Sequence, residues 1–216
     1  MLRTLAHPLV ILQLLLFPTS CASGQRYAYD NVTLNLPMVG QDSVALLVVD
    51  QRQPVVGKQY PASFTGTYQA SPSEQEPVLT KSGAPFADDV GNVVRHALER
   101  GGYTVGLVRA DPGLSSTQAF ERLRGEAAEQ LILIEVLEWQ SNTFKNMQID
   151  YELHLSVFNS SGALKGQSRV RGSDQLPPSH TDSESAQSAA AGQALAHKLG
   201  MLFSEPKVAS AFRRRY

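Results

Sequence analysis

Apolar residues recur along this chain with two different periods, and each period predicts a type of secondary structure. Residues 44–50 form a continuous apolar run that ends in an acid; it is too short for a helix and typical of a central strand covered on both faces. Over 85–100 the apolar positions recur every three or four residues, which predicts a helix that stops at Gly101 and Gly102. A second strand is expected at 103–108.

The second half of the chain predicts a polar helix, three strands and a long helix. Residues 116–130 suit the polar helix, and 131–139 are apolar enough for a central strand. Residues 148–158 alternate between apolar and polar side chains, and an Asn-Ser-Ser-Gly turn joins them to 163–172 as a hairpin. An alanine-rich helix over 183–203 then follows a capping box.

This order of elements predicts an α+β fold with a mixed, largely antiparallel sheet and helices packed on one face. The length of 216 residues suits one domain of ordinary size. The stretch 51–84 is rich in turn-forming residues and is expected to be loop with short extended pieces. The chain then divides into a signal segment (1–20), a polar tether with one short edge strand at 32–36 (21–43), a single α+β domain (44–205) and a basic tail (206–216).

The first twenty residues have the order of a secretory signal. Arg3 precedes a mostly apolar stretch at 8–17, and small residues follow it. As a helix, ten such residues span only about 15 Å, roughly half the hydrocarbon core of a bilayer. A permanent membrane-spanning helix is therefore not expected, and no later segment is apolar over the length that one needs.

Cys21, the only cysteine, has three interpretations. Thr19-Ser20-Cys21 resembles the lipobox of bacterial lipoproteins, in which the cysteine is diacylated and becomes the first residue, although Pro18 stands where leucine is usual. Cleavage after Ala22 also fits a small-x-small site, and a buried thiol is the third interpretation. Because an exported chain gains little from a lone thiol, we expect the first, and two acyl chains would give stable anchoring.

The sequence offers little catalytic or ligand chemistry. Its histidines form neither an HxxxH nor an HExxH pair, and a single cysteine excludes sites built on paired cysteines, so neither a metal site nor a cofactor is predicted. His154 is expected on a solvated strand face, Trp139 in the core, and Asp88 and Asp89 at the positive end of a helix. A net charge of -1 gives no general attraction for nucleic acid.

One stretch, LVVDQRQPVVG at 47–57, favours a specific contact. A central strand ends in Asp50, Arg52 comes two residues later, and Gly57 follows. In a structural interpretation, Asp50 caps a turn and Arg52 pairs with it or with a carboxylate on the neighbouring strand. In a functional interpretation, the same corner of Asp50, Arg52 and Gly57 presents charge to a partner; we favour the structural one.

On these residues the chain resembles the YajG-type bacterial lipoproteins. The resemblance runs loosely over 44–203 and consists of the strand that ends in Asp50-Gln51-Arg52, the helix that leads to Gly102-Tyr103-Thr104-Val105, the strand that begins at Leu131 and the hairpin over 151–172. The resemblance implies an outer-membrane lipoprotein with no defined reaction. Ala22, rather than Asp, after the cysteine resembles signals for outer-membrane sorting.

These observations predict a non-catalytic protein, anchored through a lipid on Cys21 to the periplasmic face of the outer membrane. Its domain would bind another envelope protein or a cell-wall component. The alternative is a soluble periplasmic carrier that holds an apolar ligand between sheet and helices, which needs a deep apolar pocket of about 300–1,000 Å³. A hydrolase would need a nucleophile and a base within hydrogen-bond reach, and the sequence predicts no such pair.

Overall fold

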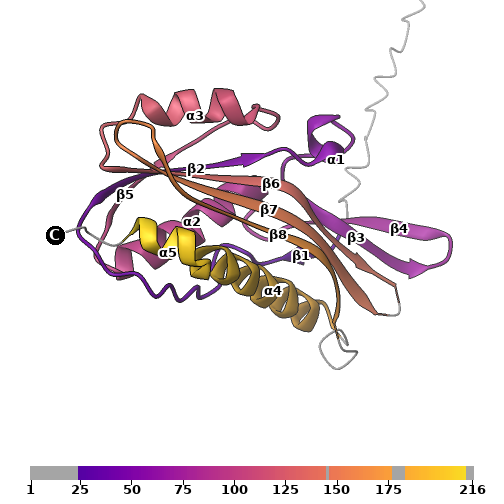
Figure 1. Ribbon diagram of the computed structural model, residues 1–216. Helices are drawn as coiled ribbons and strands as arrows, with labels where there is room; N and C mark the ends of the chain where they lie inside the picture. Colours follow the sequence, from indigo (N-terminus) through magenta and orange to yellow (C-terminus); the bar gives the residue numbers. More distant parts are fainter. Residues whose placement is uncertain (1–23, 145, 177–182, 213–216) are drawn as a thin grey trace, which may run out of the picture.

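The computed structural model describes residues 24–144, 146–176 and 183–212, and within them one sheet is packed against helices (Figure 1). The elements follow the chain as β1 (Arg26–Tyr27), β2 (Ser43–Asp50), α1 (Gln53–Val56), β3 (Phe64–Ser71), β4 (Glu74–Thr80), α2 (Phe86–Arg100), β5 (Thr104–Val108), α3 (Ser116–Arg124), β6 (Gln130–Thr143), β7 (Met147–Asn159), β8 (Leu164–Leu176), α4 (Glu184–Ser204) and α5 (Pro206–Ala211).

Strand β6 is the centre of the sheet. Along one edge it pairs antiparallel with β7, which in turn pairs antiparallel with β8. Along its other edge it pairs in parallel first with β2 and then with β3; β5 lies beside β2, and β4 beside β3. The long pairings are antiparallel and the parallel ones are shorter, so the predicted α+β fold with a mixed, largely antiparallel sheet is confirmed.

Helices lie on both faces of the sheet, although the pattern predicted them on one. The main core lies between the sheet and α2, α4 and α5, where β7 contributes an unbroken row of buried residues: Ile149, Tyr151, Leu153, Leu155 and Val157. On the opposite face, Ala119 and Leu123 of α3 pack on Leu47 of β2 and Leu133 of β6 in a smaller cluster. Figure 1 shows α3 apart from α4 and α5, across the sheet from them.

The predicted polar tether is wrong from residue 24 onward, because this segment is part of the domain. Tyr27 and Tyr29 are fully buried in the main core, and Leu34 and Met38 are buried further along. The short strand is Arg26–Tyr27, which pairs in parallel with the end of β4, and no strand forms at 32–36. Burial of two tyrosine rings holds the segment far more firmly than a solvated tether would be held.

The predicted basic tail over 206–216 also begins too early. Residues Pro206–Ala211 form helix α5, which packs on β8 and β7, and Val208 and Phe212 are buried. Phe212 makes edge contacts with Tyr103 and a tilted contact with Phe203, so aromatic packing fixes this end of the domain. The three arginines at 213–215 lie outside the described residues.

The signal segment and Cys21 lie outside the described residues as well. None of the helices in the described part of the chain is both long and apolar enough to cross a membrane.

Candidate functional site

The predicted corner lies where β6 changes its neighbour. Strand β2 pairs with β6 as far as Val136, and β3 pairs with it from Ser141 onward. A register shift between Val136 and Glu138 marks the same place on the side of β7. On this edge, the four residues of β6 between the two parallel pairings have no strand partner. The carbonyl group of the buried Trp139 therefore needs another donor, because buried carbonyl groups are costly to leave unpaired.

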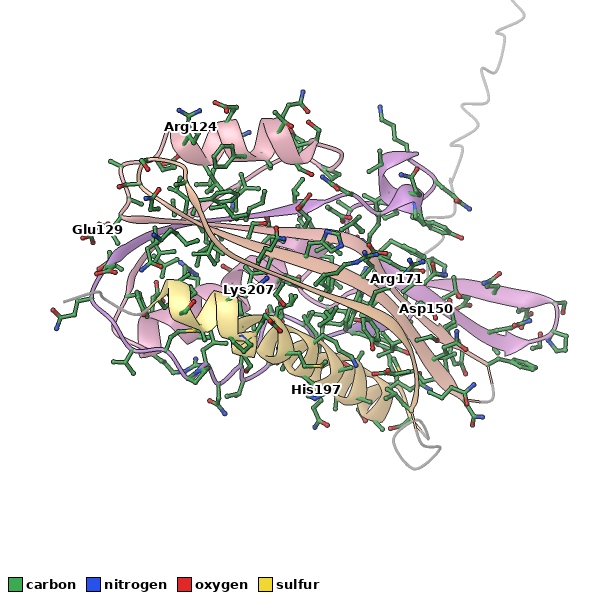
Figure 2. The ribbon with its side chains drawn as sticks, in the orientation of Figure 1. Arg124, Glu129, Asp150, Arg171, His197 and Lys207 are labelled. Carbon is green, nitrogen blue, oxygen red and sulfur yellow. The ribbon has the colours of Figure 1, made fainter. Side chains whose placement is uncertain are left out.

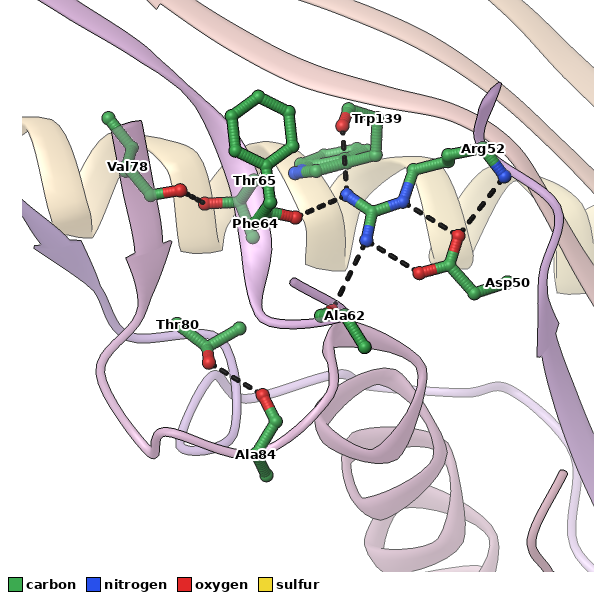
Figure 3. Close-up of polar contacts among 9 residues, drawn as sticks. All are labelled: Asp50, Arg52, Ala62, Phe64, Thr65, Val78, Thr80, Ala84 and Trp139. Carbon is green, nitrogen blue, oxygen red and sulfur yellow. Dashed lines mark hydrogen bonds and ion pairs between the residues drawn. The ribbon is translucent and has the colours of Figure 1, made fainter. Parts of the chain in front are cut away.

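Arg52 lies at this junction and bonds to residues of β2, β3 and β6 (Figure 3). Its Nε and Nη2 donate to Asp50 Oδ1 and Oδ2 at 2.8 and 2.6 Å, and Asp50 Oδ1 also accepts from the Arg52 backbone N–H at 3.1 Å. Its Nη1 donates to the carbonyl oxygens of Phe64 and Trp139 at 2.6 and 3.2 Å. Nη2 lies 3.5 Å from the carbonyl oxygen of Ala62, so the planar fork of five N–H donors is fully used.

Aromatic rings close over the ion pair. The guanidinium carbon of Arg52 lies 4.8 Å from the centre of the Phe86 ring, and Phe86 stacks on Trp139 at 5.7 Å. Tyr29 meets both rings edge-on, its hydroxyl accepts a hydrogen bond from Trp139 Nε1 at 3.3 Å, and burial raises the pKa of that hydroxyl. Asp50 and Arg52 are each only 2% exposed, which supports the structural interpretation of the corner.

Gly57 does not join this pair. It ends α1, and its backbone N–H bonds to the carbonyl oxygen of Gln53 at 2.9 Å. A different glycine is critical here: Gly66 on β3 has φ of 154°, and a Cβ there would lie 1.9 Å from the carbonyl oxygen of Ser141. The absent side chain lets β3 reach β6 immediately beyond the Arg52 junction.

The grooves formed by described residues open at the surface. One groove, of about 930 Å³, lies between the loop at 37–42, the turn at 101–102 and the end of α5. A smaller one of about 350 Å³ lies over the junction, beside Gln53, Glu138 and Glu152. Between the sheet and α2 and α4, Trp139 and Phe86 fill the described interior at 0–1% exposure, and this packing gives the carrier hypothesis no support.

His154 lies on the open face of β7, in an ionic cluster centred on Glu152. His154 Nε2 is 3.0 Å from Glu152 Oε1, to which Arg169 Nη2 donates at 2.8 Å. Arg171 Nε lies 3.2 Å from the other carboxylate oxygen. The cluster links β7 to β8 on a half-exposed surface, which is the solvated face expected for His154.

The two neighbouring acids at the start of α2 have different surroundings. The Asp88 side chain is 24% exposed and lies 3.8 Å from Arg109 Nε, whereas Asp89 is 1% exposed. The hydroxyl of Ser82 lies 2.9 Å from each carboxylate oxygen of Asp89. Burial raises the pKa of Asp89 to about 7, with smaller contributions from the charges of Asp30 and Asp88, and the Ser82 bond opposes the rise.

One buried charged residue, Lys198, was not identified from the sequence. Lys198 of α4 is 5% exposed, and its Nζ lies 2.5 Å from Asp174 Oδ2 and donates to the Tyr151 hydroxyl at 3.0 Å. Burial lowers the pKa of Lys198, but the bonds and charges of Asp174 and Tyr151 outweigh burial and leave this pKa raised. These contacts fix α4 to β7 and β8. Lys198 lies three residues after Leu195 and so shares the buried face of α4, and that spacing was the available signal.

One hydroxyl and one carboxylate also meet under α3. Ser116 at the start of α3 donates to Glu135 of β6, whose side chain is buried. The contact anchors the first turn of α3, whose capping box is formed by Ser115 and Gln118. Among the described residues, no group of three or more His, Cys, Asp or Glu side chains is placed to hold a metal ion.

Comparison with solved structures adds information about the fold. A protein from Xanthomonas campestris, described under the family name DUF330, is 16% identical, with 82% of this chain and 91% of that chain covered and a TM-score of 0.52. The likeness shows a shared fold. The lipoprotein GNA1162 from Neisseria meningitidis matches at 9% identity, with 74% and 98% of the two chains covered and a TM-score of 0.31. The C-terminal domain of LpoB from Escherichia coli matches at 12% identity, covers 63% and 86%, and has a TM-score of 0.28.

No protein-family model and no curated protein sequence matches the chain. The YajG-type resemblance therefore stays a prediction, and the function must be argued from the residues of this chain.

Proposed function

We propose that this protein is a non-catalytic, lipid-anchored component of the bacterial cell envelope whose domain binds another envelope component. The observation that carries the proposal is the position of Cys21. It follows a signal-type apolar segment and precedes Gly24, the first described residue of the domain, by three positions. A lipid on the sulfur would hold the folded domain directly at the membrane.

The start of the domain supports a short link. A Cβ at Gly24 would lie 2.5 Å from the carbonyl oxygen of Pro77 in β4, and the backbone N–H of Arg26 bonds to Glu184 at the start of α4 at 3.0 Å. Three extended residues reach only about 10 Å. An anchored domain would therefore keep the middle of β4 and the start of α4 near the lipid headgroups, and a partner would have to approach the rest of the surface.

The buried charged groups support a binding role rather than catalysis. Asp50 and Arg52 satisfy each other inside the core, and Lys198 is committed to Asp174 and Tyr151. A catalytic acid, base or nucleophile must reach a substrate, and these groups are enclosed by their own structural partners. Outer-membrane placement is part of the proposal, because Ala22 after the cysteine resembles signals for outer-membrane sorting.

Labelling in cells tests the anchor. With a labelled fatty acid in the medium, the wild-type chain and the matched control Ser23→Ala are expected to carry label and to sediment with membranes. Cys21→Ala is expected to do neither. Label on Cys21→Ala, or an unlabelled wild-type chain, would contradict the proposal, and crosslinking in intact cells followed by mass spectrometry identifies the partner.

A further inference from the structure

Strand β8 has an open edge. It is 13 residues long and pairs with β7 on one side only. Among the described residues, no backbone hydrogen bond joins its other side to any element. An edge of this kind presents a row of free N–H and C=O groups, which is a template for one more strand.

The packing of β8 leaves this edge accessible. Helix α5 lies on the inner face of β8, where a Cβ at Gly166 would come 2.4 Å from the carbonyl oxygen of Lys207. Only Gly166 and Val170 of β8 are buried, whereas every second residue of β7 is buried throughout. The helices therefore cover the inner face of β8 and not its open edge. Although β8 is 13 residues long, it adds little apolar area to the core.

Three side chains on the outer face of β8 are basic. Lys165, Arg169 and Arg171 share that face with the neutral Gln167, Ser173 and Gln175, and the arginine side chains are 51% and 65% exposed. One carboxylate, Glu152, lies between the two arginines on β7. The next acid on the outer face of β7, Asp150, lies opposite Ser173, so the positive stretch of the edge is limited to residues 165–171.

We propose that the β8 edge binds an extended segment of a partner protein as an additional strand, and that acidic side chains at alternate positions of that segment face Lys165, Arg169 and Arg171. The inference rests on the proposed function, in which the domain binds another envelope component. Backbone hydrogen bonds would supply affinity, and opposite charges at directly paired positions would supply selectivity.

A second copy of the chain is a poor occupant of this edge. If two antiparallel β8 strands met with Arg169 of one copy opposite Arg171 of the other, like charges would be paired, and like charges at paired positions destabilise a sheet. A partner strand with acidic side chains avoids that repulsion and matches the charge.

Hydrogen exchange on the full-length protein in detergent micelles tests the edge directly. The probe is a ten-residue peptide of alternating Glu and Val, and a peptide of alternating Lys and Val is the comparison. Without peptide, the β8 amides that point away from β7 should exchange fast. The Glu peptide should slow them at least tenfold, and the Lys peptide should leave them unchanged.

Charge reversal supplies the matched controls. Arg169→Glu with Arg171→Glu should weaken binding of the Glu peptide at least tenfold, and the same change at Arg122 and Arg124, exposed on α3, should leave it unchanged. Figure 2 shows Arg124 on α3, away from Arg171 on β8. In the double charge reversal, the two introduced glutamates would face Glu152, and this repulsion destabilises the fold. A second variant, Arg169→Gln with Arg171→Gln, avoids the repulsion. Once its melting temperature is shown to be unchanged, it keeps the test valid if the first variant unfolds.

Three hydrogen-exchange results would overturn the inference: equal protection by both peptides, protection outside β8, or no protection by the Glu peptide. No protection by the Glu peptide is also the result expected if the basic side chains only protect the edge against aggregation. A peptide-dependent dimer would place a second copy at this edge and would also contradict the proposal. None of these readouts depends on the lipid, so failure of the anchor and failure of the edge are separate results.

Discussion

The guanidinium of Arg52 donates to both carboxylate oxygens of Asp50 at 2.6 and 2.8 Å, and the pair is buried where β6 passes from one parallel neighbour to another. The same guanidinium binds the carbonyl oxygens of Phe64 and Trp139, which the ladder leaves unpaired. A single side chain thus replaces strand pairing at a break in the sheet. Its charge is neutralised locally by Asp50, so the break is stable inside the core.

Removal of the Arg52 side chain is expected to be severe. Arg52→Ala leaves a buried carboxylate without its partner and frees two buried carbonyl groups, so the free energy of unfolding should fall by about 3–5 kcal/mol. In a domain of this size, such a loss lowers the melting temperature by roughly 6–20 °C. Urea and thermal unfolding measure it, with exposed Arg122→Ala as the control. An Arg52→Ala protein that melts with the wild type would show that the junction does not stabilise the fold.

The N-terminal segment should behave as core and not as tether. Tyr29→Ala removes a fully buried ring that touches Phe86 and Trp139, and we expect a loss of about 3–5 kcal/mol in the free energy of unfolding. Exposed Val39→Ala, later in the same segment, is the matched control and should change stability little. If both substitutions have equally small effects in denaturant titrations, the segment behaves as a solvated tether and this prediction is wrong.

The sequence could not reveal this segment for a physical reason. Tyr27 and Tyr29 alternate with Arg26 and Ala28 among polar residues, so they produce no apolar run, whereas the alternation at 32–36 looks like a strand and is not one. Burial of the tyrosines depends on α4 and on β4, which lie far along the chain. The strands at 44–50 and 148–158 were predictable because their own residues show the pattern: a continuous apolar run in the first and apolar–polar alternation in the second.

The site was partly predictable for a similar reason. Asp50 and Arg52 are two residues apart, so their pairing is local and the sequence indicated it. The carbonyl groups that Arg52 binds are 12 and 87 residues away, and nothing in a single sequence indicates such contacts. Helix α5 was predicted as tail because six residues of helix give too little periodicity to recognise.

Asp89 should make stability depend on pH. Its pKa is about 7 in the folded protein and 3.8 in the unfolded reference, so the folded state binds more protons between these values. Stability therefore falls as pH rises from about 4 to about 7, by at most roughly 1.4 kcal/mol for each unit of pKa difference. Asp89→Asn should be more stable than wild type at pH 8 and similar to it at pH 4.

The control for this prediction is the neighbouring acid. Asp88→Asn removes a charge that makes only a small contribution to the raised pKa of Asp89, so the fall in stability with rising pH should persist and become slightly smaller. A constant difference between Asp89→Asn and wild type across pH 4–8 would show that Asp89 is not protonated preferentially in the folded state.

Lys198 should stabilise the packing of α4 on the sheet. Lys198→Ala removes both the Asp174 ion pair and the Tyr151 hydrogen bond, and because Asp174 is partly exposed we expect a loss of about 1–3 kcal/mol in the free energy of unfolding. Lys198→Met keeps most of the buried side-chain volume and should lose less. The exposed substitution His197→Ala is the control in denaturant titrations. If Lys198→Met costs as much as Lys198→Ala, the volume of the side chain has no part in the effect.

The central claim is that a lipid on Cys21 holds the domain at the membrane, and the intact mass of the mature protein purified from membranes tests it most directly. We predict a chain that begins at Cys21 and carries the added mass of acyl groups. A chain that begins at Ser23, or one that retains residues 1–20 with an unmodified thiol, would contradict the account.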